Sequence, residues 1–106
     1  MLFRSVAGVD ALREMTDWFR DRLTSGVFVL GTVMEGRPTL VASVTSDVVE
    51  RGADAEELAR RMGRAMGGGG GGRPTMAQAG GSDPSKLNEA LDQASAILRE
   101  QFERQA

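Results

Sequence analysis

The stretch of this chain best suited to chemistry is a run of six glycines, Gly67 to Gly72, followed directly by Arg73. Glycine adopts positive φ without steric cost, and the exposed backbone amides of such a run can face an anion. The ordinary interpretation is a flexible linker. Here, however, an amphipathic helix pattern precedes the run and a short apolar segment follows it. We therefore predict a Gly-rich loop over residues 67–72 that is internal to the domain, and not a linker.

Positive charge gathers around these glycines, although the chain as a whole has a net charge of -2. That total argues against binding of nucleic acid by bulk charge. Residues 60–87 nevertheless hold a single anion, Asp83, against five cations: Arg60, Arg61, Arg64, Arg73 and Lys86. Such a patch is compatible with salt-sensitive contact to phosphate. The alternative is that the arginines form a solvated helix face, and their charges alone favour this alternative.

Two of the usual catalytic and metal-binding side chains are missing. The chain has no His and no Cys, which excludes a disulfide framework and a zinc site of the usual kind. Hydroxyls such as those of Ser43 and Thr45 have no histidine to activate them, so we interpret them as structural. We expect no catalytic residue, no metal and no cofactor.

The first half of the chain predicts a helix and a hairpin. A helix begins at Asp10, has the apolar stripe Leu12, Met15, Phe19 and Leu23, and ends at Ser25 and Gly26. Residues 2–6 are a weaker candidate for an edge strand. Residues 27–34 are apolar on both faces, as in a buried strand, and residues 39–45 follow as its antiparallel partner after a turn over residues 35–38. Val48 and Val49 extend this segment until Gly52 interrupts it.

The second half supplies two helices and the segment between them. Asp54 begins a helix with the stripe Leu58, Met62, Ala65 and Met66. Residues 75–79 predict a short strand close to a helix, and Gln78 within it either satisfies a backbone group or contacts a ligand. Asp83 and Pro84 begin the last helix, whose stripe is Leu87, Leu91, Ala94, Leu98 and Phe102. The far end of this helix, residues 97–106, packs in the core or on another copy of the chain.

We therefore predict one α/β (α+β) domain over residues 1–106, with the order β-α-β-β-α-β-α and helices packed on a mixed sheet. A chain of 106 residues is large enough to fold on its own core. Its apolar runs are too short to span a membrane, and residues 1–11 do not resemble a signal peptide. These features predict a cytoplasmic protein without membrane contact.

The residues from Gly69 to Leu87 form a long ordered motif. It consists of the glycine run, Arg73-Pro74, then residues 76–81 (Met-Ala-Gln-Ala-Gly-Gly) and residues 83–87 (Asp-Pro-Ser-Lys-Leu). This motif closely resembles the C-terminal globular domain (C-Ala) of bacterial alanyl-tRNA synthetase, a version of the DHH-associated domain that RecJ-like phosphodiesterases also carry. The resemblance extends more loosely over essentially the whole chain.

The resemblance implies a non-catalytic appendage of alanyl-tRNA synthetase that contacts the elbow of tRNA(Ala) and helps couple aminoacylation with editing. Its partners would be tRNA, the remaining domains of the synthetase and, in some members, a second copy in a homodimer. Folded RNA is recognised largely by shape and sugar-phosphate contacts. Guided by the local positive charge, we expect phosphate contacts from loop amides and three cations: Gly68, Gly69, Gly70, Gly71, Gly72, Arg73, Arg64 and Lys86.

The chain departs from the enzymes that it resembles. RecJ-like relatives carry a histidine directly after the glycines, where this chain has Arg73, and no DHH motif is present. The aminoacylation motifs and the zinc ligands of the editing domain are also missing, so this chain alone is not an enzyme. Two alternatives stay open: a dimerisation or structural module without RNA binding, and the phosphate-binding domain of a RecJ-like phosphodiesterase relative.

Overall fold

Five strands form one mixed sheet in the computed structural model, which describes residues 2–5, 14–15, 17–18, 21 and 25–105. Of residues 2–5 and 105, only the backbone is described. The strand order is β1-β2-β3-β5-β4, where β1 (Leu2–Ser5) runs parallel to its neighbour and the other pairs are antiparallel. The prediction of an α+β domain with a mixed sheet is confirmed. The start of the helix predicted at Asp10 lies outside the described residues, whereas Glu14, Met15, Asp17, Trp18 and Asp21 are helical.

The central hairpin joins β2 (Val27–Met34) to β3 (Arg37–Val44). Its turn is only two residues long, because Glu35 and Gly36 both adopt positive φ, at 51° and 75°. This is the geometry of the tight hairpin turns that match the twist of paired strands. The predicted turn over residues 35–38 is therefore too long. Arg37 and Pro38 belong to β3, opposite Met34 and Val33.

A short helix, α2 (Ser46–Glu50), follows β3 and was not predicted. Its first turn is fixed by Asp47, whose carboxylate accepts hydrogen bonds from the hydroxyls of Ser25 and, at 2.6 Å, Thr45. These two bonds hold the pKa of Asp47 below its ordinary value. The valines at 48 and 49 therefore belong to a helical turn and do not extend the strand.

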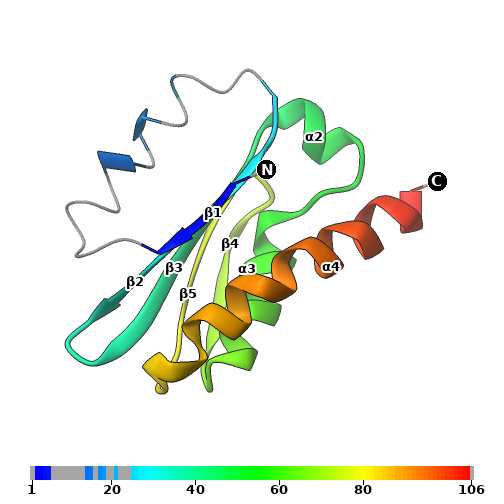
Figure 1. The fold of residues 1–106 in the computed structure, drawn as a ribbon. Helices are drawn as coiled ribbons and strands as arrows, with labels where there is room; N and C mark the ends of the chain where they lie inside the picture. The colour runs from blue at the N-terminus through cyan, green and yellow to red at the C-terminus, as the bar shows by residue number, and fades with distance from the viewer. Residues whose placement is uncertain (1, 6–13, 16, 19–20, 22–24, 106) are drawn as a thin grey trace.

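Two helices cover one face of the sheet: α3 (Ala55–Ala65) and α4 (Leu87–Gln105), which follows the single 3-10 turn η1 (Pro84–Lys86). Figure 1 shows both helices on the same side of the strands. Asp54 caps α3 and Asp83 caps η1, as predicted. The main core lies between this face and the helices, and it contains Val29 and Leu40 from the strands and Leu58, Met62 and Leu98 from the helices. We call this face of the sheet the helix face.

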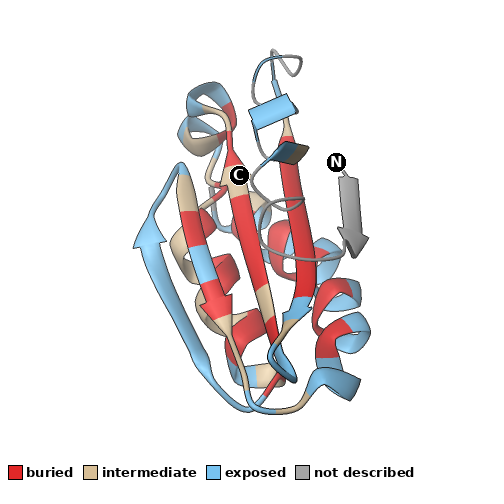
Figure 2. Ribbon diagram, turned by 90° about the vertical axis from the view of Figure 1, so that its left-hand side faces the viewer, coloured by how far each residue is buried: buried red, intermediate tan, exposed pale blue. Residues whose placement is uncertain are grey.

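The opposite face is only partly covered. Phe28, Leu30 and Val41 form a second, smaller cluster there, with Met15 and Met76 packed against it. Figure 2 looks onto this face and shows that no described element lies over β5 (Met76–Gly80) or β4 (Gly69–Arg73). We call this face the open face. Its uncovered part consists of one edge of the sheet.

Candidate functional site

Most of the glycine run forms an edge strand, so the prediction of a loop over residues 67–72 is wrong for residues 69–72. Gly69 to Arg73 make up β4, which pairs along its whole length with β5, from Gly69 opposite Gly80 to Arg73 opposite Met76. Gly68 lies before the strand, and its amide donates a hydrogen bond of 2.9 Å to the carbonyl of Gly63 at the end of α3. Unlike a loop, this segment does not gather its amides around one point.

Close packing against α3 explains why glycine is needed at alternate positions of β4. A Cβ atom added to Gly70 would lie 2.8 Å from the carbonyl oxygen of Ala59 on α3, and one added to Gly63 would lie 2.5 Å from the carbonyl oxygen of Gly69. Helix and strand therefore meet backbone to backbone. In contrast, Cβ atoms added to Gly69 or Gly71 would meet nothing within 4 Å. These two glycines face the open side of the sheet, where they leave the backbone accessible.

Arg73 is positioned by the two-residue turn that joins β4 to β5. The carbonyl of Pro74 accepts a hydrogen bond of 3.0 Å from the amide of Ala55, and the carbonyl of Thr75 accepts one of 2.9 Å from the amide of Val44. The turn is thus fixed to the start of α3 and the end of β3. The Arg73 side chain is exposed and forms no ion pair within the described part of the chain.

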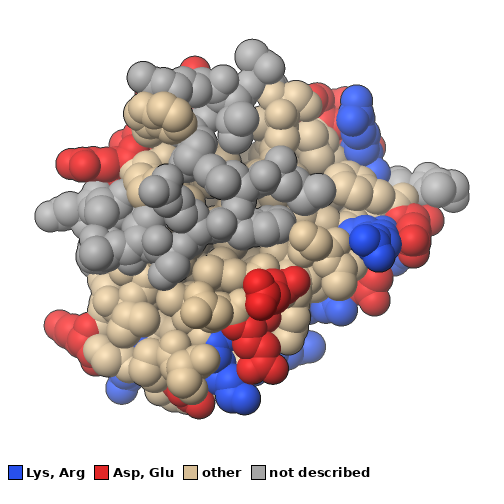
Figure 3. All heavy atoms as spheres, in the orientation of Figure 1, with Lys and Arg blue, Asp and Glu red and all other residues tan. Residues whose placement is uncertain are grey.

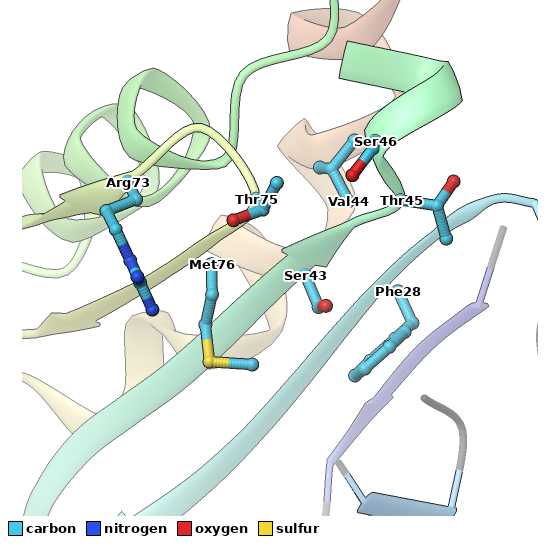
Figure 4. A pocket seen from close by; sticks show the side chains of 8 residues that line it. All are labelled: Phe28, Ser43, Val44, Thr45, Ser46, Arg73, Thr75 and Met76. Carbon is cyan, nitrogen blue, oxygen red and sulfur yellow. The ribbon is translucent and has the colours of Figure 1, made fainter. Parts of the chain in front are cut away.

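Arg73 lies at the end of a row that crosses four strands. The register places Phe28 opposite Ser43, Ser43 opposite Met76, and Met76 opposite Arg73. Figure 4 shows these four side chains directed to the same side of the sheet. A cavity of about 480 Å³ lies beside the row and is also lined by Val44, Thr45, Ser46 and Thr75. It combines an apolar floor, several hydroxyls and one guanidinium, which are groups that can contact a polar anionic ligand.

The other two predicted cations lie apart from Arg73. Arg64 is exposed in the last turn of α3, on the other side of the sheet and at the opposite end of β4. Lys86 lies in η1 and forms an ion pair of 3.4 Å with Glu89. The structure therefore does not bring Arg64, Arg73 and Lys86 together at one point.

Several of the remaining cations are neutralised by neighbouring carboxylates. Arg60 pairs with Glu56 at 3.4 Å, Arg61 pairs with Glu100, and Arg104 pairs with Glu57. Figure 3 shows basic and acidic side chains next to one another on the surface around α4. For Arg60 and Arg61, the alternative of a solvated helix face is therefore correct.

Two residues of the open face differ from what the sequence predicts. Gln78 has a different environment from the predicted one, and Arg37 was not among the predicted contact residues. The side chain of Gln78 is exposed and makes no hydrogen bond within the described part of the chain, so it does not satisfy a backbone group. Arg37 is exposed at the first position of β3 and lines a shallow hollow of about 430 Å³ together with Gly68 and Gly80. The two-residue turn places Arg37 in the strand, and alternation then puts its side chain on the open face. The sequence contained this signal in Glu35-Gly36, but the predicted turn was too long.

Features of other functional classes are few in the described residues. Within the part of the chain that the structure describes, no three carboxylates gather where they could hold a metal ion. Among the helices described, none combines the length and the apolar character needed to cross a membrane. The described residues of the open face thus offer surface contacts to a ligand.

Known proteins similar to this chain agree on one domain type. The family model described as the DHHA1 domain matches residues 3–100. The alanine-tRNA ligase of Pelotomaculum thermopropionicum is 52% identical over 94 residues, which are 89% of this chain and 11% of that relative. An alanine-tRNA ligase of Dehalococcoides mccartyi is 47% identical over 89 residues, 84% of this chain and 10% of that relative. The chain spans about a tenth of the length of these curated relatives.

A solved structure extends the similarity to three dimensions. The C-Ala domain from Aquifex aeolicus alanyl-tRNA synthetase has a TM-score of 0.75 to this chain and 27% sequence identity, covering 95% of this chain and 90% of that one. The match includes nearly all of both chains, so the similarity concerns a whole domain and is not confined to the glycine motif.

Proposed function

This chain belongs to the DHHA1 domain family, and from that premise we propose that it is a non-catalytic domain of an alanine-tRNA ligase that contacts folded tRNA. Its role is to hold the elbow of tRNA(Ala) and so help couple aminoacylation with editing in the whole synthetase. The remaining domains of that synthetase are its protein partners, in the cytoplasm, and the domain needs no cofactor of its own. The similarity to alanine-tRNA ligases supports this assignment.

The observation that carries the proposal is the position of Arg73 beside an uncovered glycine strand. An exposed guanidinium without an ion pair partner in the described residues keeps its charge available for phosphate. Gly69 and Gly71 beside it carry no side chain that would keep an RNA backbone away from the sheet. We propose this part of the open face as the primary contact. Arg64, at the other end of β4, and Lys86, in η1, contribute as secondary contacts.

Titration of the 106-residue chain with folded tRNA at low and at physiological salt tests the proposal. We expect binding that weakens with salt, because each neutralised phosphate releases counterions. Arg73→Ala lowers the affinity and reduces the salt slope by about 0.9, whereas Arg64→Ala has a smaller effect. Unchanged affinity in an Arg64/Arg73/Lys86 triple alanine variant, or no binding by the unaltered chain at low salt, contradicts the proposed function.

A further inference from the structure

We propose that Arg37 and Arg73 form a two-point contact with the sugar-phosphate backbone of double-helical RNA, one at each end of the open face. This inference rests on the proposed function and adds to it a second contact residue and the form of RNA that the surface fits. Four features of the structure support it: the shared face, the free charges, the floor between the two arginines and their separation.

Strand register places both arginines on the open face. Along β3, Arg37 has the same orientation as Thr39, Val41 and Ser43, because side chains alternate between the two faces of a sheet. Ser43 lies opposite Met76, and Met76 opposite Arg73. Met76 packs against the cluster of the open face, whereas Ala77 and Ala79 belong to the core beneath the helices. Arg37 and Arg73 therefore project from the same side of the sheet.

Both guanidinium groups are available. Arg37 and Arg73 are exposed, and neither forms an ion pair or a side-chain hydrogen bond within the part of the chain that the structure describes. Most other described cations on the helices have a carboxylate partner, as Arg61 has in Glu100. A phosphate that meets Arg37 or Arg73 therefore does not have to displace a protein carboxylate first.

The surface between them suits a polyanion. The residues in between that face the open side include Thr39, Gln78 and three glycines, Gly69, Gly71 and Gly80. A Cβ atom would have free space at the first two of these glycines, and at Gly80 its nearest neighbour would be the carbonyl oxygen of Pro38 at 3.6 Å. None of the open-face residues of β2, β3, β5 and β4 carries a carboxylate. The surface between the two arginines is thus lowered by three glycines and carries no acidic side chain.

The separation of the two arginines fits a double helix, and the composition of the open face argues against a single strand. Arg37 precedes the Ser43 row by six residues, which corresponds to about 20 Å along a strand. A single phosphate cannot bridge that distance, but the wide, shallow minor groove of A-form RNA presents phosphates on both of its sides. Single strands are usually held by stacking on aromatic side chains, and the aromatic residue of the open-face cluster, Phe28, is buried. The described strands of the open face thus offer no exposed aromatic side chain on which unpaired bases could stack.

The test compares the unaltered chain with four variants in titrations with folded tRNA and with an RNA hairpin duplex across a salt series. We expect Arg37→Ala and Arg73→Ala each to reduce the salt slope by about 0.9, and the double variant to reduce it by about 1.8. Arg99→Ala is the matched control, because Arg99 is also exposed and lacks an ion pair but lies on α4. Circular dichroism verifies that the variants keep the fold.

The outcomes separate this inference from the proposed function. If tRNA binds and Arg37→Ala behaves like the Arg99→Ala control, the two-point contact is wrong while the proposed function stands. Preference for an unstructured RNA of equal length over the hairpin duplex also overturns it. No binding of any RNA at low salt overturns both. A reduced slope for Arg37→Ala, together with preference for the duplex, supports the inference.

Discussion

Gly70 and Gly71 are neighbours in one strand but have opposite surroundings. Gly70 faces α3, where an added methyl group would lie 2.8 Å from the Ala59 carbonyl oxygen and equally close to the Ala79 side chain. Gly71 faces the open side and would meet nothing within 4 Å. The chemical role of the glycine run therefore divides by position: one set of glycines admits the helix, and the other leaves the sheet surface bare.

This division predicts opposite effects of two alanine substitutions. Gly70→Ala overpacks the interface with α3 and is expected to cost about 1 to 3 kcal/mol of folding free energy. Gly71→Ala is expected to be neutral or to stabilise by up to about 1 kcal/mol, because it restricts the unfolded chain without creating a clash. Urea unfolding followed by circular dichroism measures both. Equal destabilisation by the two variants would show that the alternation of faces along β4 is wrong.

At the scale of elements, the sequence predicts the features that are determined by residues near one another in the chain. β2 was predicted with its observed bounds, and Asp54 and Asp83 were recognised as helix caps, because these features depend on nearby residues. β4 was missed, since glycine has a low strand propensity and its pairing depends on β5 and α3. Because strand pairing cannot be read from local signals, the predicted contact residues were those that lie near the glycine run in the sequence. Arg37, whose place on the open face depends on strand register, was absent from that group.

The junction of α3 and α4 contains a polar contact that the helix stripes did not reveal. Gln101 is only 1% exposed. Its amide nitrogen donates hydrogen bonds to the carbonyl of Asp54 at 3.1 Å and to the carboxylate of Glu57 at 2.9 Å, and its oxygen accepts one from the amide of Asp54 at 3.0 Å. Arg104 also donates to Glu57. α4 is thereby fixed to the first turn of α3.

This junction makes part of the stability dependent on pH. The hydrogen bond from Arg104, followed by that from Gln101, holds the pKa of Glu57 below its ordinary value of 4.5. A carboxyl whose pKa is lowered by folding stabilises the protein above its unfolded pKa, and that contribution disappears as pH falls through the folded pKa. Glu57→Gln should therefore be less stable than the unaltered chain at pH 7, and the difference should shrink below pH 4.5.

Urea unfolding at a series of pH values from neutral to acidic measures this dependence. Asp92→Asn is a suitable control, because Asp92 is exposed on α4 and has no ion pair within the described residues. A constant difference between Glu57→Gln and the unaltered chain at every pH would contradict the assignment of this acid-sensitive contribution to Glu57.

At the scale of the molecule, this chain corresponds to about a tenth of the length of its curated relatives. A few phosphate contacts on one small face give modest affinity by themselves. Covalent linkage to other RNA-binding units replaces a second encounter in solution by an intramolecular one, which raises the overall affinity 10²- to 10⁴-fold without new contacts. The open face is therefore suited to orient an RNA that the rest of the proposed synthetase also holds.

The alternative role of the surface is the association of two copies of the chain. The described residues give little support for such a dimer interface. The apolar residues near the end of α4, Ile97 and Leu98, are buried within the chain's own core, and Phe102 packs against it. The large hydrophobic residues that are exposed in the described part, Trp18 and Val33, lie on different elements. A stable dimer usually buries a continuous patch, about 800 Å² on each partner.

We therefore expect a monomer of 11.3 kDa in sedimentation experiments over a concentration series. A concentration-dependent dimer would instead indicate pairing through the outer edge of β4, since an edge strand exposes unpaired backbone groups to a second copy. Such a dimer would occupy the strand that we propose for RNA, so that tRNA should then compete with self-association.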